Sequence, residues 1–300
     1  MPRCLTFVDQ VENPVRVRAG GAIMVNPRRG RQDKAPWRDL DLTAISGSMI
    51  EETHVFRAVL GENVAPYVTL EPLLAVLPVR RDNGDMLPAG DGEFSVAGVD
   101  LQPLGRLMRR RWRTVSALWD EHKQPVNRLT LLEQLDYRRK LSRQLAWRAS
   151  ASGSDCRVVY TKSGRPTAAR LLDRDVIVDH TLYWMPCAGE SEAAYLLALI
   201  NSDALRDAVE PHMSRGLWGA RDLHKHLWNL AIPRFDADDQ LHLAVAAAGE
   251  AAANGADELL PDGDGLAGPA ARRLLRQWLA DVPEGREVER VVGALLQRVA

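Results

Sequence analysis

A short basic segment that contains two glycines, residues 214–221 (SRGLWGAR), carries residue types suited to nucleic-acid binding. Glycine lets a backbone approach a phosphate closely. Arg215 and Arg221 can bind phosphate or read guanine edges through two parallel hydrogen bonds. Trp218 can stack on a base or insert beside one. An ordinary surface loop with a tryptophan in the core has the same pattern, so the residues alone leave both interpretations open.

Two further groups of cations fit the same chemistry. Lys225 lies between His224 and His226, and two histidines at this spacing share a face only in a strand. Because no Cys, Asp or Glu at usual ligand spacing accompanies them, we expect a phosphate-facing segment and no metal site. The segment RVVYTKSGR predicts a strand followed by a turn that carries Lys162 and Arg165, and this turn is either a DNA contact or an ordinary hairpin tip.

The charge of the chain is unevenly distributed. The net charge of −1 gives no bulk attraction to nucleic acid, but residues 104–148 hold 12 basic against 4 acidic residues. Within that region, Arg109, Arg110 and Arg111 predict contacts with a DNA backbone, unless they form a solvated helix face. Residues 236–300 hold 6 basic against 12 acidic residues, which predicts an acidic region that faces solvent or a partner.

The elements that must position these residues follow from the hydrophobic periodicity. Strand-like segments and turns predict a β-rich connector over residues 1–100. Apolar residues at spacings of three and four predict a basic helical pair within residues 101–148, with helices near 104–119 and 129–147. Residues 149–236 predict an α/β segment, and residues 237–300 predict an acidic helical tail. The expected fold class is therefore α+β, a mixed sheet-and-helix domain with flanking helices.

Strands and one helix start are predicted inside residues 149–236. Residues 157–160, 176–178 and 181–185 are rich in β-branched and aromatic residues, which favour strands. Ser191 is expected to cap the following helix.

Motifs for catalysis are missing from the sequence. It contains no Walker-type phosphate loop, no G-x-G-x-x-G, no G-x-S-x-G and no H-E-x-x-H. An adenine amino-methyltransferase needs an Asn-Pro-Pro-aromatic turn to hold the amine of a flipped base. The Asn-Pro pairs at Asn13 and Asn26 are followed by Val15 and Arg28, so neither qualifies. We therefore predict no catalytic residue in this chain.

Apolar runs and cysteines indicate the compartment. No uninterrupted apolar span of about 18 residues exists, so we expect no membrane partner. Charge appears too early in the first residues for a signal peptide. Three widely separated cysteines indicate a reducing cytoplasm, with buried or idle thiols.

Five stretches in order resemble a known family. In the region from about Leu129 to Phe235, these stretches are LEQLDYRRKLSRQL, VVYTKSGRPTAARLL, VIVDHTLYWMP, SEAAYLLALINS and GLWGARDLHKHLWNLAIPRFD. Together this region resembles the carboxy-terminal target-recognition region of large adenine-specific (N6) DNA methyltransferases from restriction-modification and phage-defence systems. NPRRGRQDKAPW and VLGENVAPY look like the connector that follows the methyltransferase domain in those proteins.

The resemblance implies a role in choosing the DNA sequence. The full family chain binds S-adenosylmethionine and methylates adenine N6, while its carboxy-terminal region selects the site. Since the cofactor loop and the Asn-Pro-Pro-aromatic turn are absent here, we expect a truncated or separately encoded specificity half. Such a chain would bind double-stranded DNA and act with a methyltransferase or nuclease partner, which would hold the S-adenosylmethionine. Two alternatives stay open: a methyltransferase active by itself, and a subunit of a phage-defence complex that does not bind DNA.

Overall fold

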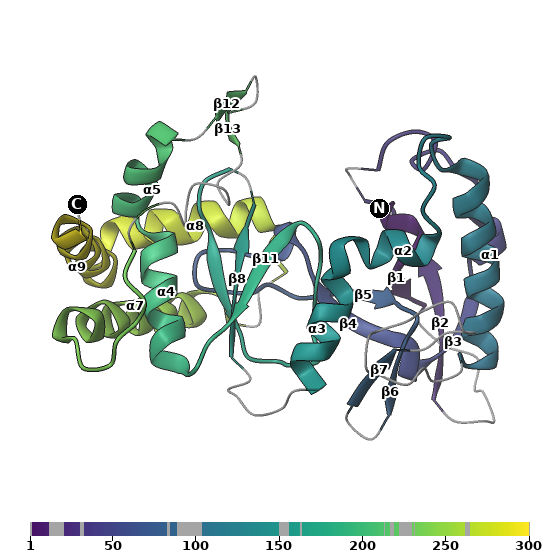
Figure 1. Ribbon diagram of the computed structural model, residues 1–300, viewed down its shortest axis with the longest axis horizontal. Coiled ribbons are helices and arrows are strands. Elements are labelled where there is room, and N and C mark those ends of the chain that lie inside the picture. Colours follow the sequence, from purple (N-terminus) through teal and green to yellow (C-terminus); the bar gives the residue numbers. More distant parts are fainter. Residues whose placement is uncertain are drawn as a thin grey trace. The chain divides into compact units, whose positions relative to one another are not determined.

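The computed structural model describes the chain as two compact units built from interleaved stretches of sequence (Figure 1). Unit 1 comprises Met1–Ala58, Leu73–Ala151 and Asp175–Ile177, and unit 2 comprises Val59–Pro72, Ser152–Arg174 and Val178–Ala300. The residues described are 2–11, 21–30, 33–82, 85–88, 104–149, 156–162, 164–212, 214–216, 219–221, 230, 232–261 and 265–299. Their helices and mixed sheets confirm the α+β prediction. The boundaries of the units differ from those of the predicted segments. Residues 59–72, which lie inside the predicted connector 1–100, belong to unit 2.

A sheet and one long helix form most of the core of unit 1. The strands run in the order β10-β4-β5-β1-β2-β3, and α1 (Arg106–His122) packs against β3. Val25 and Ile50 of the sheet and Met108 of α1 are fully buried, so the periodic apolar face predicted for this helix does meet the sheet. The strands are β1 (Phe7–Gln10), β2 (Ala22–Pro27), β3 (Ser48–Glu51), β4 (Val55–Val59), β5 (Leu73–Val76) and β10 (Ile177–Val178), and a separate hairpin contains β6 (Val79–Asp82) and β7 (Asp85–Pro88).

Glu51, at the end of β3, caps the amino terminus of α1. Its carboxylate oxygens accept hydrogen bonds from the backbone amides of Leu107 at 2.8 Å and Met108 at 2.9 Å. These amides have no partner within the helix, so the carboxylate satisfies them and meets the positive end of the helix dipole. Burial alone would raise the pKa of Glu51, but the hydrogen bonds outweigh it and lower the pKa below its ordinary value.

This cap predicts a pH-dependent contribution to stability. A carboxyl whose pKa is lower in the folded state stabilises the fold above its unfolded pKa, near 4.5, and loses that contribution as the pH falls through the folded pKa. At pH 7 we expect Glu51→Gln to lower the free energy of unfolding by roughly 0.3–1 kcal/mol, because Glu51 is partly exposed. Urea denaturation between about pH 7 and pH 3 should show the two proteins converging in acid. A difference that did not change with pH would contradict this role.

The predicted helix over residues 129–147 is wrong as a single element. The structure has α2 (Leu131–Leu135) and α3 (Lys140–Ala149), separated at Arg138 and Arg139, where φ is 58° and 57°. Asp136 stabilises the restart, since its Oδ1 accepts from the amides of Leu141 and Ser142 at 2.9 and 2.8 Å. The apolar spacing is therefore shared by two short helices that meet at a left-handed turn.

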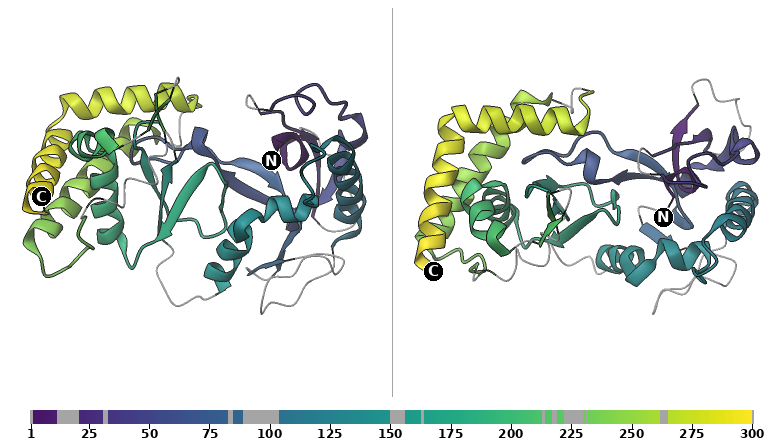
Figure 2. Two further views of the ribbon diagram at one scale, coloured as in Figure 1. Left: turned by 45° about the horizontal axis from the view of Figure 1, so that its top comes forward. Right: turned by 90° about the horizontal axis from the view of Figure 1, so that it is seen from above.

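Unit 2 places helices against a three-stranded antiparallel sheet. The sheet has the order β11-β8-β9, and α4 contacts both β8 and β9 on one side and α7 on the other (Figures 1 and 2). The strands are β8 (Arg157–Thr161), β9 (Ala168–Leu171) and β11 (Leu182–Pro186), with a separate hairpin of β12 (Ser214–Gly216) and β13 (Gly219–Arg221). The helices are α4 (Glu190–Asn201), α5 (Asp203–Val209), α7 (Gln240–Leu259), α8 (Gly268–Asp281) and α9 (Pro283–Val299).

The contact between α4 and α7 is made by very small residues. Gly249 of α7 faces Ala194 and Ala198 of α4, and these two alanines and Ala252 of α7 are almost completely buried. A Cβ built at Gly249 would overlap the backbone carbonyl oxygen of Ala194. The absence of a side chain at Gly249 therefore sets how closely these two helices approach.

The three last helices are integral to unit 2. Leu275 of α8 and Val292 and Leu295 of α9 are fully buried in its main hydrophobic cluster, so they form core as well as acidic surface. One predicted helix start was wrong: α4 begins at Glu190, and its N-cap position is Gly189, two residues before the predicted cap at Ser191. Among the described residues, no helix is long and apolar enough to cross a membrane. The three cysteines are buried and free, as predicted.

Candidate nucleic-acid interface

The turn between β8 and β9 carries the two cations that the sequence placed there. The backbone amide of Thr161 donates to the carbonyl of Thr167 at 3.0 Å, which closes the hairpin, and Gly164 has a φ of 80°. The Nζ atom of Lys162 lies 4.8 Å from the centre of the Tyr183 ring. A cation at this distance from an aromatic ring is held in place and keeps its charge near the surface.

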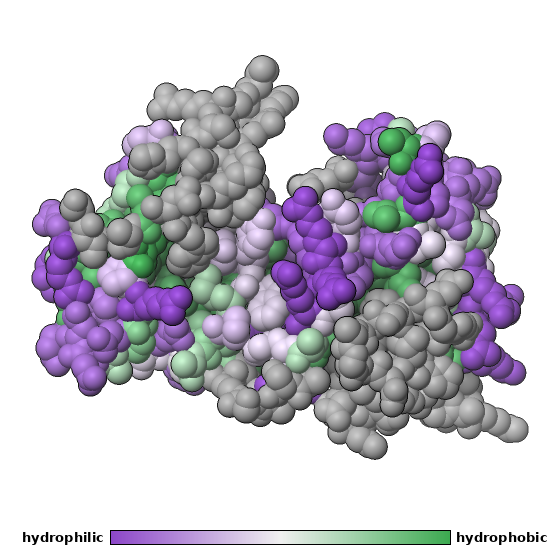
Figure 3. Space-filling view, in the orientation of Figure 1, coloured by the Kyte–Doolittle hydropathy of each residue, from purple (hydrophilic) through white to green (hydrophobic). Residues whose placement is uncertain are grey.

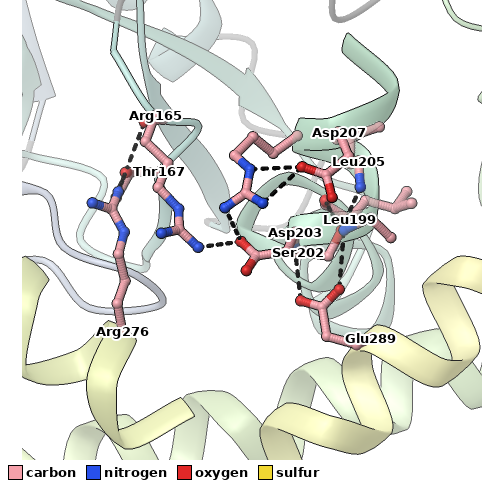
Figure 4. A network of polar contacts seen from close by, with 11 residues as sticks. Arg165, Thr167, Leu199, Ser202, Asp203, Leu205, Asp207, Arg276 and Glu289 are labelled. Atoms are coloured by element: carbon pink, nitrogen blue, oxygen red, sulfur yellow. Dashed lines mark hydrogen bonds and ion pairs between the residues drawn. The ribbon is translucent and has the colours of Figure 1, made fainter. Parts of the chain in front are cut away.

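Arg165 extends from the same turn toward the start of α5. Its guanidinium forms an ion pair with Asp203, whose carboxylate also accepts from Arg206 at 2.8 Å (Figure 4). The Arg165 side chain is 37% exposed, so it is anchored at one end and still reaches solvent. Arg206 is held in turn by Asp207 at 2.7 Å.

A third arginine reaches this turn from α8. Arg276 donates to the Oγ1 atom of Thr167 at 2.6 Å. Its other two guanidinium nitrogens have no hydrogen-bond acceptor within the part of the chain that the structure describes. Burial, together with the positive charges of Arg165, Arg272 and Arg206, lowers the pKa of Arg276 to about 10, and Asp203 only partly opposes this. Arg276 therefore stays charged at neutral pH in a locally positive environment.

These side chains line a pocket of about 220 Å³ within unit 2. Arg165, Arg276 and Arg286 contribute its cations, and Leu279 and Val288 contribute apolar wall. The end of α8 and the start of α9 both contribute lining residues to this pocket. The two helices meet there at a sharp corner (Figure 2). Segments distant in the sequence thus place positive charge around one small hollow.

The acidic and amide groups in this pocket are already committed to the fold. The two carboxylate oxygens of Glu289 accept from the backbone amides of Asp203 and Ala204, at 2.7 and 3.0 Å (Figure 4). Asn201 bonds to both the amide and the carbonyl of Ala168, at 2.9 and 3.0 Å. The guanidinium nitrogens of Arg276 and Arg286 that are not bonded to Thr167 or Asp281 remain as donors for a ligand.

Two of the predicted site residues lie in the β12–β13 hairpin. Arg215 and Arg221 are in β12 and β13, so the predicted loop is a two-stranded hairpin in which Arg215 pairs with Ala220. The structure describes their backbone only. Trp218, His224 and Lys225 lie outside the described residues, and their roles stay predictions.

The arginine run on α1 belongs to unit 1, and one member needs correction. Arg110 is exposed, whereas Arg109 is half-buried and donates to the carbonyl of Leu104 at 3.3 Å. Arg111 is only 4% exposed, and its Nη1 donates to the carbonyl of Ile45 and to Ser48. Consecutive helical residues point about 100° apart, so three in a row cannot share one face. The predicted DNA contact by Arg111 is therefore wrong, because its guanidinium supports the core.

Arg276 and Arg286 are not among the site residues predicted from the sequence. Both lie within residues 236–300, for which the surplus of acidic residues predicts an acidic region. The total charge of a region does not show which of its cations face a pocket. The partner of Arg276 is also distant in sequence, since Thr167 is 109 positions away. Within the described residues, no group of three His, Cys, Asp or Glu side chains is arranged to hold a metal ion.

On the face drawn in Figure 3, hydrophilic side chains separate the hydrophobic areas of the described surface.

Comparisons with known proteins found similarity to solved structures only. No protein-family model matches the chain, and no curated protein matches it. Among solved structures, it is similar to the Type IIL restriction-modification enzyme MmeI, which was determined in complex with DNA. The two share 13% sequence identity with a TM-score of 0.46, over 82% of this chain and 28% of MmeI. The chain thus spans less than a third of that enzyme, and a similarity at this level assigns neither function nor site residues.

Proposed function

We propose that this chain is the sequence-specific DNA-binding, target-recognition part of a restriction-modification-type adenine DNA methyltransferase. It acts on double-stranded DNA together with a catalytic methyltransferase or nuclease chain, and that partner holds the S-adenosylmethionine. One observation carries the DNA-binding role: Lys162, Arg165, Arg276 and Arg286 gather on unit 2, while the carboxylates among them are already paired.

Guanidinium groups arranged in this way suit phosphates. Arginine presents fixed, planar donors that match phosphate oxygens, and lysine adds a mobile point charge. A local surplus of cations attracts a polyanion although the whole chain has a net charge of −1. The resemblance of residues 129–235 to target-recognition regions supports the same assignment and supplies the expected chemistry of the partner.

Salt dependence tests the DNA-binding role. Each phosphate neutralised by the protein lowers the logarithm of affinity by about 0.9 per decade of salt. With contacts from about four cations, duplex affinity should fall roughly 100-fold between about 50 and 200 mM salt. Fluorescence anisotropy with a labelled duplex measures this slope, and selection from a random duplex library then reveals the preferred sequence.

The same preparation separates the alternatives. A flat salt response would remove the DNA-binding role. S-adenosylmethionine binding by the isolated chain, measured by calorimetry, would favour a methyltransferase that is active by itself. Activity in a defence complex that survives loss of Lys162 and Arg165 would favour an interaction subunit that does not bind DNA.

A further inference from the structure

We infer that the pocket between the β8–β9 turn, α8 and α9 binds one phosphate group, anchored by Arg276 and Arg286. This inference rests on the proposed DNA-binding function, under which a backbone phosphate of the duplex supplies the group. It adds Arg276 of α8 and Arg286 of α9 to the cations of the β8–β9 turn as residues that bind phosphate.

The size of the pocket limits what it can hold. Pockets for cofactors and drug-sized ligands typically enclose about 300–1,000 Å³. The pocket here encloses about 220 Å³, which suits a single compact group better than a nucleotide with its base and sugar. Its apolar wall at Leu279 and Val288 offers no acceptor that would compete with an anion for the arginines.

The free donors in the pocket match an anion. Arg276 uses one nitrogen on Thr167, and Arg286 uses one on the carbonyl of Asp281 at 3.0 Å. The remaining nitrogens of both residues have no acceptor in the described parts of the chain. Two guanidinium groups with unused donors on neighbouring helices can hold a phosphate from two directions.

The charges around Arg276 favour a ligand that is negative. The positive charges of Arg165, Arg206 and Arg272 repel the positive charge of Arg276. The Asp203 carboxylate is shared between Arg165 and Arg206. The other carboxylate, Glu289, is bonded to two backbone amides. An anion would relieve the repulsion among the arginines, because no uncommitted carboxylate in the pocket does so.

The pocket can also offer a neutral donor and a firm wall. Burial and the charge of Glu289 raise the pKa of Tyr67, so its hydroxyl keeps its proton at neutral pH. At the other side, a Cβ built at Gly285 would overlap the carbonyl oxygen of Leu279, which shows how tightly α9 packs against the end of α8. A site with fixed walls loses little entropy when a ligand enters.

Neutralising variants test the inference in the full chain. We expect Arg276→Gln and Arg286→Gln each to reduce the salt slope of duplex binding by about one phosphate contact. Arg290→Gln is the matched control, because Arg290 is exposed on α9, pairs with Glu287 and does not line the pocket. Since Arg276 also bonds to Thr167, thermal unfolding must show that each variant is folded. Arg286 is exposed and provides a second test with little risk to the fold.

A neutral-phosphate scan identifies the source of the ligand. Duplexes with a single methylphosphonate at successive positions should weaken wild-type binding most at one position. At that position Arg276→Gln should lose nothing further, because the contact has already gone. Inorganic phosphate, added without DNA, should raise the melting temperature of the wild type more than that of Arg276→Gln.

The outcomes separate the two proposals. If both variants keep the wild-type slope while Lys162→Gln lowers it, the pocket inference is overturned and the DNA-binding function stands. If the wild type does not bind duplex but inorganic phosphate stabilises it through Arg276, the function fails and the phosphate site survives with a free phosphate as its ligand. If phosphate has no effect and no phosphonate position is selective, the pocket inference fails.

Discussion

Gly249→Ala should destabilise the protein by roughly 1–3 kcal/mol, although alanine is the better helix former. The added Cβ would overlap the backbone carbonyl oxygen of Ala194 and approach the side chain of Ala198. A backbone atom cannot move aside as a flexible side chain can, so α7 and α4 must separate along their buried contact. Overpacking of this kind outweighs the gain in helix propensity, which is about 1 kcal/mol.

Gly293→Ala is the matched control and should have the opposite sign. Gly293 lies inside α9, and no other atom comes within 4 Å of a Cβ built there. The substitution should stabilise the protein by roughly 0.5–1 kcal/mol through helix propensity alone. Thermal and urea unfolding of both variants check the pair. Equal shifts of the same sign would show that close approach at Gly249 does not determine the packing of α4 on α7.

Removing three cations around the β8–β9 turn should nearly abolish duplex binding. In the triple variant Lys162→Gln, Arg165→Gln and Arg276→Gln, we expect affinity to fall roughly 1,000-fold at about 0.1 M salt, since each phosphate contact contributes about a factor of ten there. The loss should shrink as salt rises, because counterions screen the wild type as well. Anisotropy titrations at several salt concentrations measure both the loss and its salt dependence.

A second triple variant controls for net charge. Arg38, Arg128 and Arg290 are exposed and do not line the pocket, so replacing all three by glutamine removes the same charge elsewhere. We expect this variant to bind within a few-fold of the wild type. Similar losses in both triples would mean that diffuse charge, rather than the surface at the β8–β9 turn, drives binding.

Local periodicity predicted many of the elements but not where they break. The apolar spacing of α1 and the β-branched run of β8 were sufficient to find both, because a repeating pattern extends over the whole element. The break between α2 and α3 was missed, since neither Arg138 nor Arg139 is a residue that typically adopts a positive φ. The Asp136 side chain that restarts the helix acts through contacts the pattern does not contain.

The candidate site was only half predictable for a similar reason. Lys162 and Arg165 occur in a turn whose flanking strands are visible in the sequence, so local reasoning found them. Arg276 reaches the same turn from α8 through a single bond to Thr167, and no local pattern links residues so far apart. Arg111 shows the converse error, because a run of arginines indicates charge without showing which side chain the helix turns inward.

The interleaving of the two units constrains which parts of this chain can be exchanged with those of a relative. The amide of Tyr67 donates to the carbonyl of Ala168 at 2.8 Å, and the Nε of Arg272 donates to the carbonyl of Val64 at 2.9 Å, so residues 59–72 help complete the interior of unit 2. A single recombination crossover near residue 150 would join these contacts from different parents. A chimera designed to exchange unit 2 between relatives must therefore carry residues 59–72 from the same parent as residues 152–174 and 178–300.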